Sequence, residues 1–198
     1  MQTYRIKQYG LEHGALEIQY LEEFFGEFPA RKSAEEIVAR LRGRPHSILM
    51  AEAALPGDPG ALAPVAYKVS HELRAAEPDP KLADLVARLQ GHVDFDNRRV
   101  LYSWIGGTRR DWRGRGHFRA LTEEQEAWAV SEGFDEIVVK TKNRNYDMRG
   151  TLDHLRFDVI NFECQPGDNA ESKVYLSKRL GADVLREHRS TRHVQRVG

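Results

Sequence analysis

The chain has 198 residues, 40% hydrophobic and 30% charged, which is enough for a real core beneath a polar surface. Its 30 basic residues equal its 30 acidic ones, so no net charge attracts nucleic acid or an anionic membrane. No apolar stretch approaches the roughly 20 residues of a membrane span, the amino terminus lacks the apolar core of a secretion signal, and the histidines show no zinc-site spacing. These features predict a soluble, cytoplasmic protein without a metal site.

The spacing of apolar residues predicts an alternation of strands and helices. In chain order these are a strand at 3–9, helices at 16–28 and 33–43, strands at 46–55 and 64–73, an inserted helix at 79–91, a strand at 98–107, a helix at 116–133, a strand at 135–142, a helix at 146–155, and strands at 157–164 and 172–180. Central strand–helix–strand units with antiparallel hairpins around them indicate one mixed-sheet α/β domain, here 1–180, followed by a basic tail, 181–198, expected to be frayed.

Local signals mark several of these boundaries. Ser33 and Glu36 form a capping box at the start of one helix, and Gly43 supplies its stop. Asp79 is placed to cap the inserted helix. That helix has an apolar stripe of Leu82, Leu85, Val86 and Leu89. Turn-forming residues at 56–63 predict an antiparallel hairpin between the two flanking strands.

A glycine- and arginine-rich segment, "YSWIGGTRRDWRGRGHFRAL" (102–121), connects a predicted strand to a predicted helix. Amides at a helix start lack internal partners, and the helix dipole favours an anion there. Glycines let the backbone approach phosphate oxygens, and arginines add positive charge. A pyrophosphate group is therefore the expected ligand of this segment.

Two common phosphate-binding motifs do not fit this segment. A Walker A loop requires GxxxxGK[ST], which is absent. A Rossmann fingerprint requires a third glycine where Arg119 stands, and an acidic residue after the next strand, which instead ends in Lys140, Thr141 and Lys142.

A third pattern does match. The stretch "RGRGHF" (113–118) resembles the [QR]-x-x-G-x-[GA] signature of the GNAT superfamily of acetyl-CoA-dependent N-acyltransferases, with Phe118 at the usual Gly or Ala. Downstream, "NYDMRGTLDHLRF" (145–157) is similar to the family's N-x-x-A-x-x-L-Y-x-x-x-G-F motif. In this second motif Leu152 stands at the tyrosine and Arg156 at the glycine.

The resemblance implies a GNAT-like sheet whose N-terminal strands are antiparallel, whose central parallel pair splays at the cofactor site, and whose faces are both covered by helices. It also implies acetyl-CoA as co-substrate, with pantetheine in the splay and pyrophosphate on the loop. The residues expected to bind the cofactor are Gly106, Gly107, Thr108, Arg113, Gly114, Arg115, Gly116, His117, Phe118, Asn145 and Met148. Homodimers are common in the family, although the sequence indicates no interface.

Catalytic residues are less well indicated. Direct transfer, which the resemblance implies, needs a route for the amine proton and a donor for the leaving thiolate. Glu72 is a candidate base acting through water, Tyr102 is a candidate for the acceptor pocket or the core, and Tyr146 could replace the missing tyrosine, as could His154. Cys164 is expected to be a core residue and not a nucleophile.

The leading hypothesis is an N-acetyltransferase that acetylates a primary amine of a small molecule or protein. A cluster of glutamates in 16–28 would suit a cationic acceptor, although a solvated helix face explains them as well. The alternative is a non-catalytic GNAT-like module that binds CoA as a sensor. A nucleic-acid contact through "RRDWRGRGHFR" is disfavoured by the zero net charge.

Overall fold

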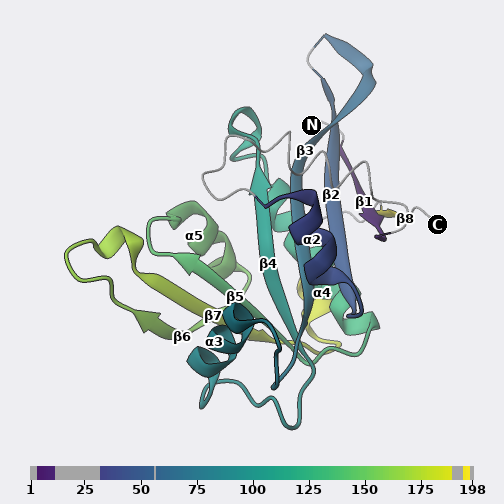
Figure 1. The fold of residues 1–198 in the computed structure, drawn as a ribbon. Coiled ribbons are helices and arrows are strands. Elements are labelled where there is room, and N and C mark those ends of the chain that lie inside the picture. The colour runs from purple at the N-terminus through teal and green to yellow at the C-terminus, as the bar shows by residue number, and fades with distance from the viewer. Residues whose placement is uncertain (1–3, 12–31, 56, 189–193, 197–198) are drawn as a thin grey trace. The chain divides into compact units, whose positions relative to one another are not determined.

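The computed structural model describes residues 4–11, 32–55, 57–188 and 194–196 (Figure 1). Its elements are β1 (Tyr4–Tyr9), α2 (Ala34–Leu41), β2 (His46–Leu55), β3 (Asp58–Leu73), α3 (Pro80–Leu89), β4 (Val100–Thr108), α4 (His117–Ser131), β5 (Glu136–Lys142), α5 (Tyr146–His154), β6 (Asp158–Glu163), β7 (Lys173–Arg179) and β8 (Val194–Arg196). The mixed α/β class is therefore confirmed. The helix predicted at 16–28 lies outside the described residues.

The chain divides into two compact units. The first comprises Met1–His71, Ile105–Gln125 and Arg189–Gly198, and the second comprises Glu72–Trp104 and Glu126–His188. The chain therefore passes from one unit to the other within β3, within β4 and within α4.

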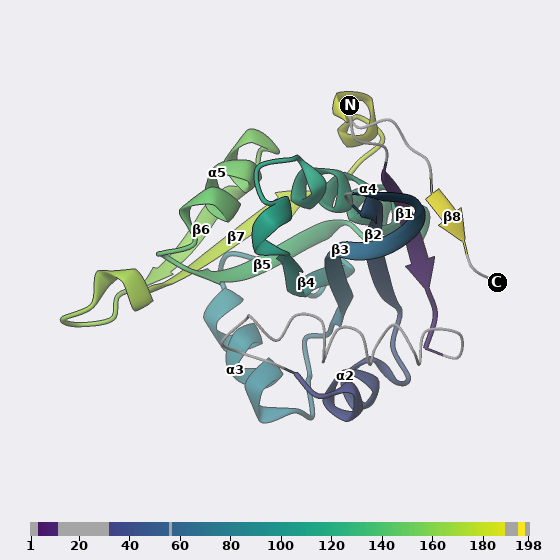
Figure 2. The ribbon, with the colours of Figure 1, turned by 90° about the horizontal axis from the view of Figure 1, so that it is seen from above.

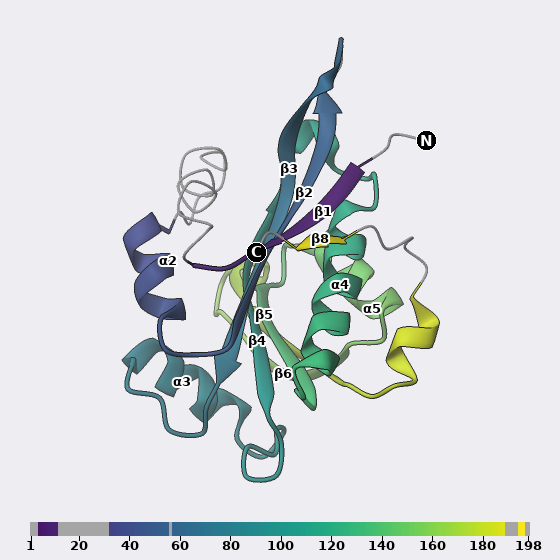
Figure 3. The same ribbon diagram turned by 90° about the vertical axis from the view of Figure 1, so that its right-hand side faces the viewer.

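In the first unit, β2 pairs with β3 and with β1, both antiparallel, and β1 pairs with β8 in parallel. Helix α2 lies on one side of β2 and β3, and α4 lies on the other (Figure 3). The core beneath α4 is apolar and consists of Ile6, Leu49, Ala51, Ala53, Val65, Ala66, Trp112, Ala120 and Leu121. The capping box of α2 is present, because Ser33 Oγ accepts from the Glu36 amide and Glu36 Oε2 accepts from the Ser33 amide, both at 3.1 Å.

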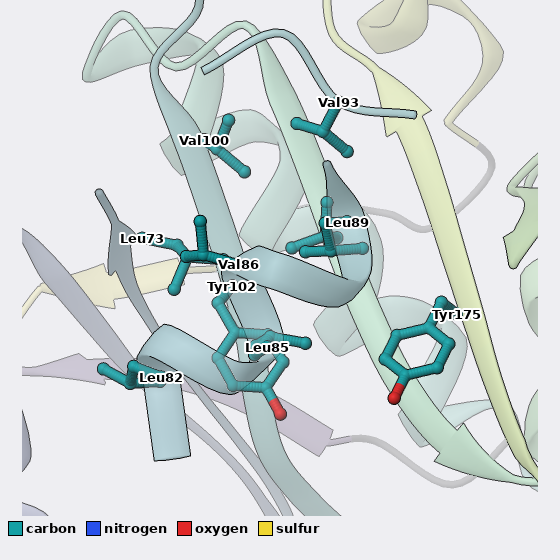
Figure 4. Packing of buried hydrophobic residues seen from close by; sticks show 10 residues of the cluster. Leu73, Leu82, Leu85, Val86, Leu89, Val93, Val100, Tyr102 and Tyr175 are labelled. Carbon is teal, nitrogen blue, oxygen red and sulfur yellow. The ribbon is translucent and has the colours of Figure 1, made fainter. Parts of the chain in front are cut away.

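In the second unit, β4 and β5 form the predicted parallel pair, β5 pairs antiparallel with β7, and β7 pairs antiparallel with β6. Helices α3 and α5 lie on opposite sides of β5 and β7 (Figure 2). The predicted stripe of α3 is buried in the core that Figure 4 shows. That core consists of Leu73, Leu82, Leu85, Val86, Leu89, Val93, Val100, Tyr102, Val138 and Tyr175. Asp79 caps α3 by accepting from the Lys81 amide at 2.7 Å, as predicted.

Three expectations are corrected. Strand β3 begins at Asp58, well before the predicted 64, because Asp58 opposes Leu55 in the hairpin and its Oδ1 accepts from the amides of Gly60 and Ala61. The tail is not entirely frayed, because β8 pairs with β1. Cys164 is exposed and not in the core, since it follows the end of β6, which is the edge strand of the described sheet next to β7.

Helix α5 ends at the arginine that replaces the family's glycine. Arg156 adopts a left-handed φ of 61°, and the helix closes with a Schellman motif. In this motif the Phe157 amide donates to the Leu152 carbonyl at 3.0 Å, and the Arg156 amide donates to the Asp153 carbonyl at 2.8 Å. A residue with a Cβ is strained in this conformation.

We expect Arg156→Gly to raise the free energy of unfolding by about 1 kcal/mol, because glycine removes the left-handed strain. Urea unfolding measures the change. The ion pair of Arg156 with Glu187 is exposed and contributes little, so Arg156→Ala is the control that removes the pair and keeps the strain. A glycine variant no more stable than the alanine variant would contradict the prediction.

Candidate anion-binding loop and acyl-transfer site

The predicted loop lies in the first unit, between the end of β4 and the start of α4. The loop contains a 3-10 turn at Arg110–Trp112, whose amide at Trp112 donates to the Arg109 carbonyl at 2.9 Å. The Trp112 side chain is buried in the core and so anchors the turn. The Arg109 amide donates to the carbonyl of Val65 on β3, also at 2.9 Å. The loop is therefore held to the sheet before it reaches the helix.

Two glycines shape the turn into α4. Gly114 and Gly116 have φ values of 73° and 83°, a region that residues with side chains rarely adopt. A Cβ built on either would meet nothing within 4 Å, so the loop opens onto free space at both positions. The first amides of α4 have no acceptor within the helix, as at every helix start. The loop thus has the geometry of an anion cradle.

Two cationic side chains of the loop, Arg113 and Arg115, are exposed. Arg113 Nε donates to the Thr108 carbonyl at 3.3 Å, and Arg115 Nη2 donates to the Asp111 carbonyl at 2.9 Å. The Arg115 guanidinium also stacks 4.5 Å from the ring of Trp112. These contacts hold both predicted arginines, Arg113 and Arg115, along the loop.

Phe118 departs from the family signature, and its contacts account for it. The ammonium of Lys68, a fully buried residue of β3, lies 4.3 Å from the centroid of the Phe118 ring. The same ammonium donates to Thr122 Oγ1 at 3.0 Å, and that hydroxyl donates to the Phe118 carbonyl at 2.8 Å. The aromatic ring thus packs over a buried cation, where a small residue would leave a gap.

Gly106, the first glycine of the pair in β4, lies close to the backbone of β3. A Cβ at Gly106 would lie 3.1 Å from the carbonyl oxygen of Tyr67 on β3, closer than most real contacts. Gly107 and Thr108 complete the strand before the loop begins. A side chain at 106 would therefore require the backbone of β3 to shift by a few tenths of an ångström, which glycine avoids.

His117 is buried, 3% exposed, at the first position of α4. Neither ring nitrogen has a hydrogen-bond partner among the residues that the structure describes. The ring packs between Tyr4, edge-on at 4.7 Å between centroids, and Trp112 at 5.9 Å. Burial lowers the pKa of His117, and the charge of Arg115 lowers it further.

We expect the free energy of unfolding to fall as pH drops below about 6.5. Below this pH His117 is protonated in the unfolded chain but stays neutral in the folded protein, where its pKa is lowered. The loss should continue down to the lowered pKa of the folded state and then level off. His117→Phe should flatten this part of the curve of thermal midpoint against pH. His92, exposed after α3, gives the control variant His92→Phe, which should keep the wild-type curve. Parallel curves for the wild type and His117→Phe would refute the assignment.

In the second unit, the parallel ladder stops early. Strands β4 and β5 pair only from Val100–Glu136 to Ser103–Val139, although β5 continues to Lys142 and remains paired with β7. Among the described strands, the last three residues of β5 therefore pair with β7 and not with β4. A parallel pair that parts in this way is the splay that the resemblance predicted.

The two residues predicted from the second motif lie at the start of α5. Asn145 is its N-cap position, but its side chain does not cap the helix; instead Asn145 Nδ2 donates to Thr141 Oγ1 at 2.9 Å. The Thr141 hydroxyl donates to Met148 Sδ at 3.5 Å. Asn145 and Met148 are thus brought together around the end of β5, while the other predicted cofactor residues lie in the first unit.

The three predicted catalytic residues, all of the second unit, are not grouped. Glu72 accepts from Arg74 at 2.8 Å and Arg99 at 3.1 Å. Burial opposes its ionisation, but these two guanidinium groups outweigh that effect and lower the pKa of Glu72. Tyr102 is buried in the α3 core, whereas Tyr146 is 65% exposed at the start of α5. A carboxylate held by two cations is a poor base, which disfavours Glu72.

Sequence reasoning passed over one polar residue of this region. Lys140 lies on β5 directly after the last residue paired with β4 and is partly buried. The segment "VVKTK" could have drawn attention to it. There Lys140 follows two buried valines, at a position where a buried strand would be expected to continue with an apolar residue. Leu152, at the family's tyrosine, is fully buried and carries no proton donor.

Comparisons with known proteins identify the fold. NAA60 of Arabidopsis thaliana in complex with acetyl-CoA superposes with a TM-score of 0.64 at 14% identity, covering 89% of this chain and 98% of that one. The NatC complex bound to Gag peptide and CoA gives 0.63 at 15%, covering 91% and 100%. A GCN5-related N-acetyltransferase of Kribbella flavida gives 0.58 at 15%, covering 89% and 98%. The chain therefore has the GNAT fold, which confirms the predicted resemblance at the level of the fold.

Comparison of the amino-acid sequence does not identify a family. No protein-family model and no curated protein sequence matches the chain. No described helix is both long and apolar enough to cross a membrane. Nor are three His, Cys, Asp or Glu side chains grouped for a metal ion anywhere in the described ranges.

Proposed function

We propose that this protein is an acetyl-CoA-dependent N-acetyltransferase that transfers the acetyl group directly to a primary amine. The observation that carries the proposal is the loop before α4, where two left-handed glycines, exposed arginines and a helix start form an anion cradle on the GNAT fold. Structural neighbours crystallised with acetyl-CoA or CoA support this ligand.

The residues present fit such a ligand. Open space at Gly114 and Gly116 leaves room for phosphate oxygens near the first amides of α4, and Arg113 and Arg115 supply compensating charge. We assign the pantetheine arm to Gly106, Gly107 and Thr108, and further contacts to His117, Phe118, Asn145 and Met148. When bound, acetyl-CoA supplies the activated thioester.

The reaction requires little covalent help from the protein. The amine nitrogen bonds to the thioester carbon, the C–S bond breaks, and the sulfur leaves with its electron pair and takes up a proton, while the amine loses one. Orientation of the two reactants can supply most of the rate. Of the predicted catalytic residues, we keep Tyr102 as a wall of the acceptor pocket and regard Glu72 and Tyr146 as weaker candidates.

The test is a screen of primary amines and short peptides with acetyl-CoA, read as release of free thiol. Turnover with any amine, saturable in both substrates, is the expected result. We further propose that the protein acts in the cytoplasm, and a homodimer would accord with the resemblance. Failure of acetyl-CoA to stabilise the folded protein would overturn the proposal.

A second candidate function is a non-catalytic sensor that binds CoA. It is favoured by the buried Leu152 in place of the family's tyrosine and by the ion pairs that occupy Glu72. Turnover separates the two functions: a sensor would be stabilised by acetyl-CoA but would release no thiol with any acceptor.

A further inference from the structure

Lys140 is a cation without a matching anion. It lies on β5 opposite Tyr175 of β7, so both side chains project from the same face of the sheet. Its ammonium lies 5.9 Å from the centroid of the Tyr175 ring. Within the described part of the chain, no acceptor lies within hydrogen-bond distance of this ammonium, and no carboxylate lies within 4 Å of it.

The two carboxylates that act on Lys140, Glu163 and Asp84, are already engaged. Glu163 accepts from Lys173 at 2.7 Å through Oε1 and from the Tyr175 hydroxyl at 3.0 Å through Oε2. Arg88 adds an ion pair at 3.4 Å to the same Oε2 and reaches Asp84 at 3.4 Å with its Nε. Both oxygens of Glu163 are therefore used by other donors.

The charges around Lys140 do not balance. The charged groups that act most strongly on its ammonium are two cations, Lys173 and Arg88, and two carboxylates, Asp84 and Glu163. Among these groups and Lys140 itself, three positive charges face two negative ones, an excess of one. Burial lowers the pKa of Lys140 and Lys173 lowers it further; a bound anion would oppose both effects.

The position of Lys140 in the sheet suits a role in the proposed reaction. It is the first residue of β5 beyond the ladder with β4, where the splay begins. In Figure 4 the hydroxyls of Tyr102 and Tyr175 both point in the direction in which β4 runs from Val100 to Tyr102. Tyr102 and Tyr175 are both buried, whereas Lys140 is only partly buried, so Lys140 is the one of these three polar side chains that a ligand could reach.

We propose that Lys140 binds the carboxylate of the acceptor, so that the substrate class is a small primary amine that carries a carboxylate. The inference rests on the proposed acetyltransferase function and specifies its acceptor. An excess of a single positive charge matches a monoanion such as a carboxylate better than a phosphate dianion.

The probes are matched pairs of amines with and without the acidic group. Glycine is compared with methylamine, β-alanine with ethylamine and 4-aminobutyrate with propylamine, and 2-aminoethylphosphonate provides the phosphate-like arm. Thiol release gives kcat/KM for each probe. The thermal midpoint of the CoA-bound protein, with and without each probe, measures binding independently of turnover.

At least one aminocarboxylate should exceed its plain amine, and Lys140→Met should remove that preference. Loss of one charge-assisted contact should lower kcat/KM for the aminocarboxylate by about 10- to 100-fold, or 1.4–2.8 kcal/mol at about 1.4 kcal/mol per tenfold, and leave the plain amine unchanged. Lys140→Arg should retain the preference. Lys142→Met is the matched control, because Lys142 projects from the same strand face but pairs with Glu171 on the surface.

The outcomes separate this inference from the function on which it rests. If acetyl-CoA does not stabilise the wild type, the proposed function itself fails. If acetyl-CoA stabilises it but plain amines, peptides or the phosphonate are equal or better substrates, the assignment of a carboxylate is overturned. The same holds if no aminocarboxylate is acetylated or raises the midpoint, and if Lys142→Met reproduces the effect of Lys140→Met.

Discussion

Replacing Gly116 by glutamate should abolish the stabilisation that acetyl-CoA gives the wild-type protein. A ligand at about 100 times its Kd adds roughly 2.7 kcal/mol to the free energy of unfolding, a rise in thermal midpoint of about 5–10 °C for a chain of this size. In the variant, a side chain occupies the open space of the loop, a negative charge faces the phosphates, and the left-handed φ of 83° is strained.

The backbone strain must be separated from the loss of the ligand. Gly91, which follows α3, has a nearly identical φ of 82° and equally open surroundings. Gly91→Glu should therefore lower the midpoint of the free protein by a similar amount and keep the full acetyl-CoA shift. If Gly116→Glu, still folded, keeps the shift as well, the anion does not bind at this loop.

Removing the carboxylate of Glu126 should produce the largest loss of stability. This residue of α4 is completely buried, and both of its oxygens accept from Lys178 Nζ at 3.0 Å, while His188 Nε2 lies 2.7 Å from Oε2. Glu126→Leu would leave the buried ammonium of Lys178 without this partner. We expect a cost of about 3–5 kcal/mol, measured by urea unfolding.

The double variant shows whether the cost arises from the orphaned charge. Replacing both partners, as Glu126→Leu with Lys178→Met, should restore most of the lost stability, since apolar pairs often replace buried ion pairs at little cost. Glu171→Gln, which removes an exposed partner of Lys142 and Arg144, should cost less than about 1 kcal/mol. A double variant as unstable as Glu126→Leu alone would show that packing, and not charge, dominates.

The features predicted correctly from the sequence were those that depend on contacts between residues close together in the chain. The capping box at Ser33, the Asp79 cap and the stripe of α3 each depend on contacts inside one helix or its first turn, and each is found as predicted. The loop before α4 was readable for the same reason, because Gly114 and Gly116 mark left-handed backbone wherever they fold. The second motif likewise predicted α5.

Residues whose surroundings come from distant segments were predicted least well. Glu72 was a candidate base until folding placed it between Arg74 and Arg99, the second of which is far along the chain. Phe118 was an unexplained departure until Lys68 came to lie against its ring. The pairing of β8 with β1 joins the two ends of the described chain, and no local pattern indicates it.

The sequence by itself therefore determined the order of strands and helices, the mixed α/β class and the glycine turn before α4, because caps, apolar periodicity and glycine conformation act within one element. Only the tertiary structure decided which charges are compensated. Lys140 and Lys178 are both lysines on neighbouring strands, yet Lys178 pairs with Glu126, whereas Lys140 forms no ion pair with any carboxylate in the described part of the chain. That difference depends on which segments, remote in sequence, folding brings to each ammonium, because the energy of a charge is set by its neighbours in space.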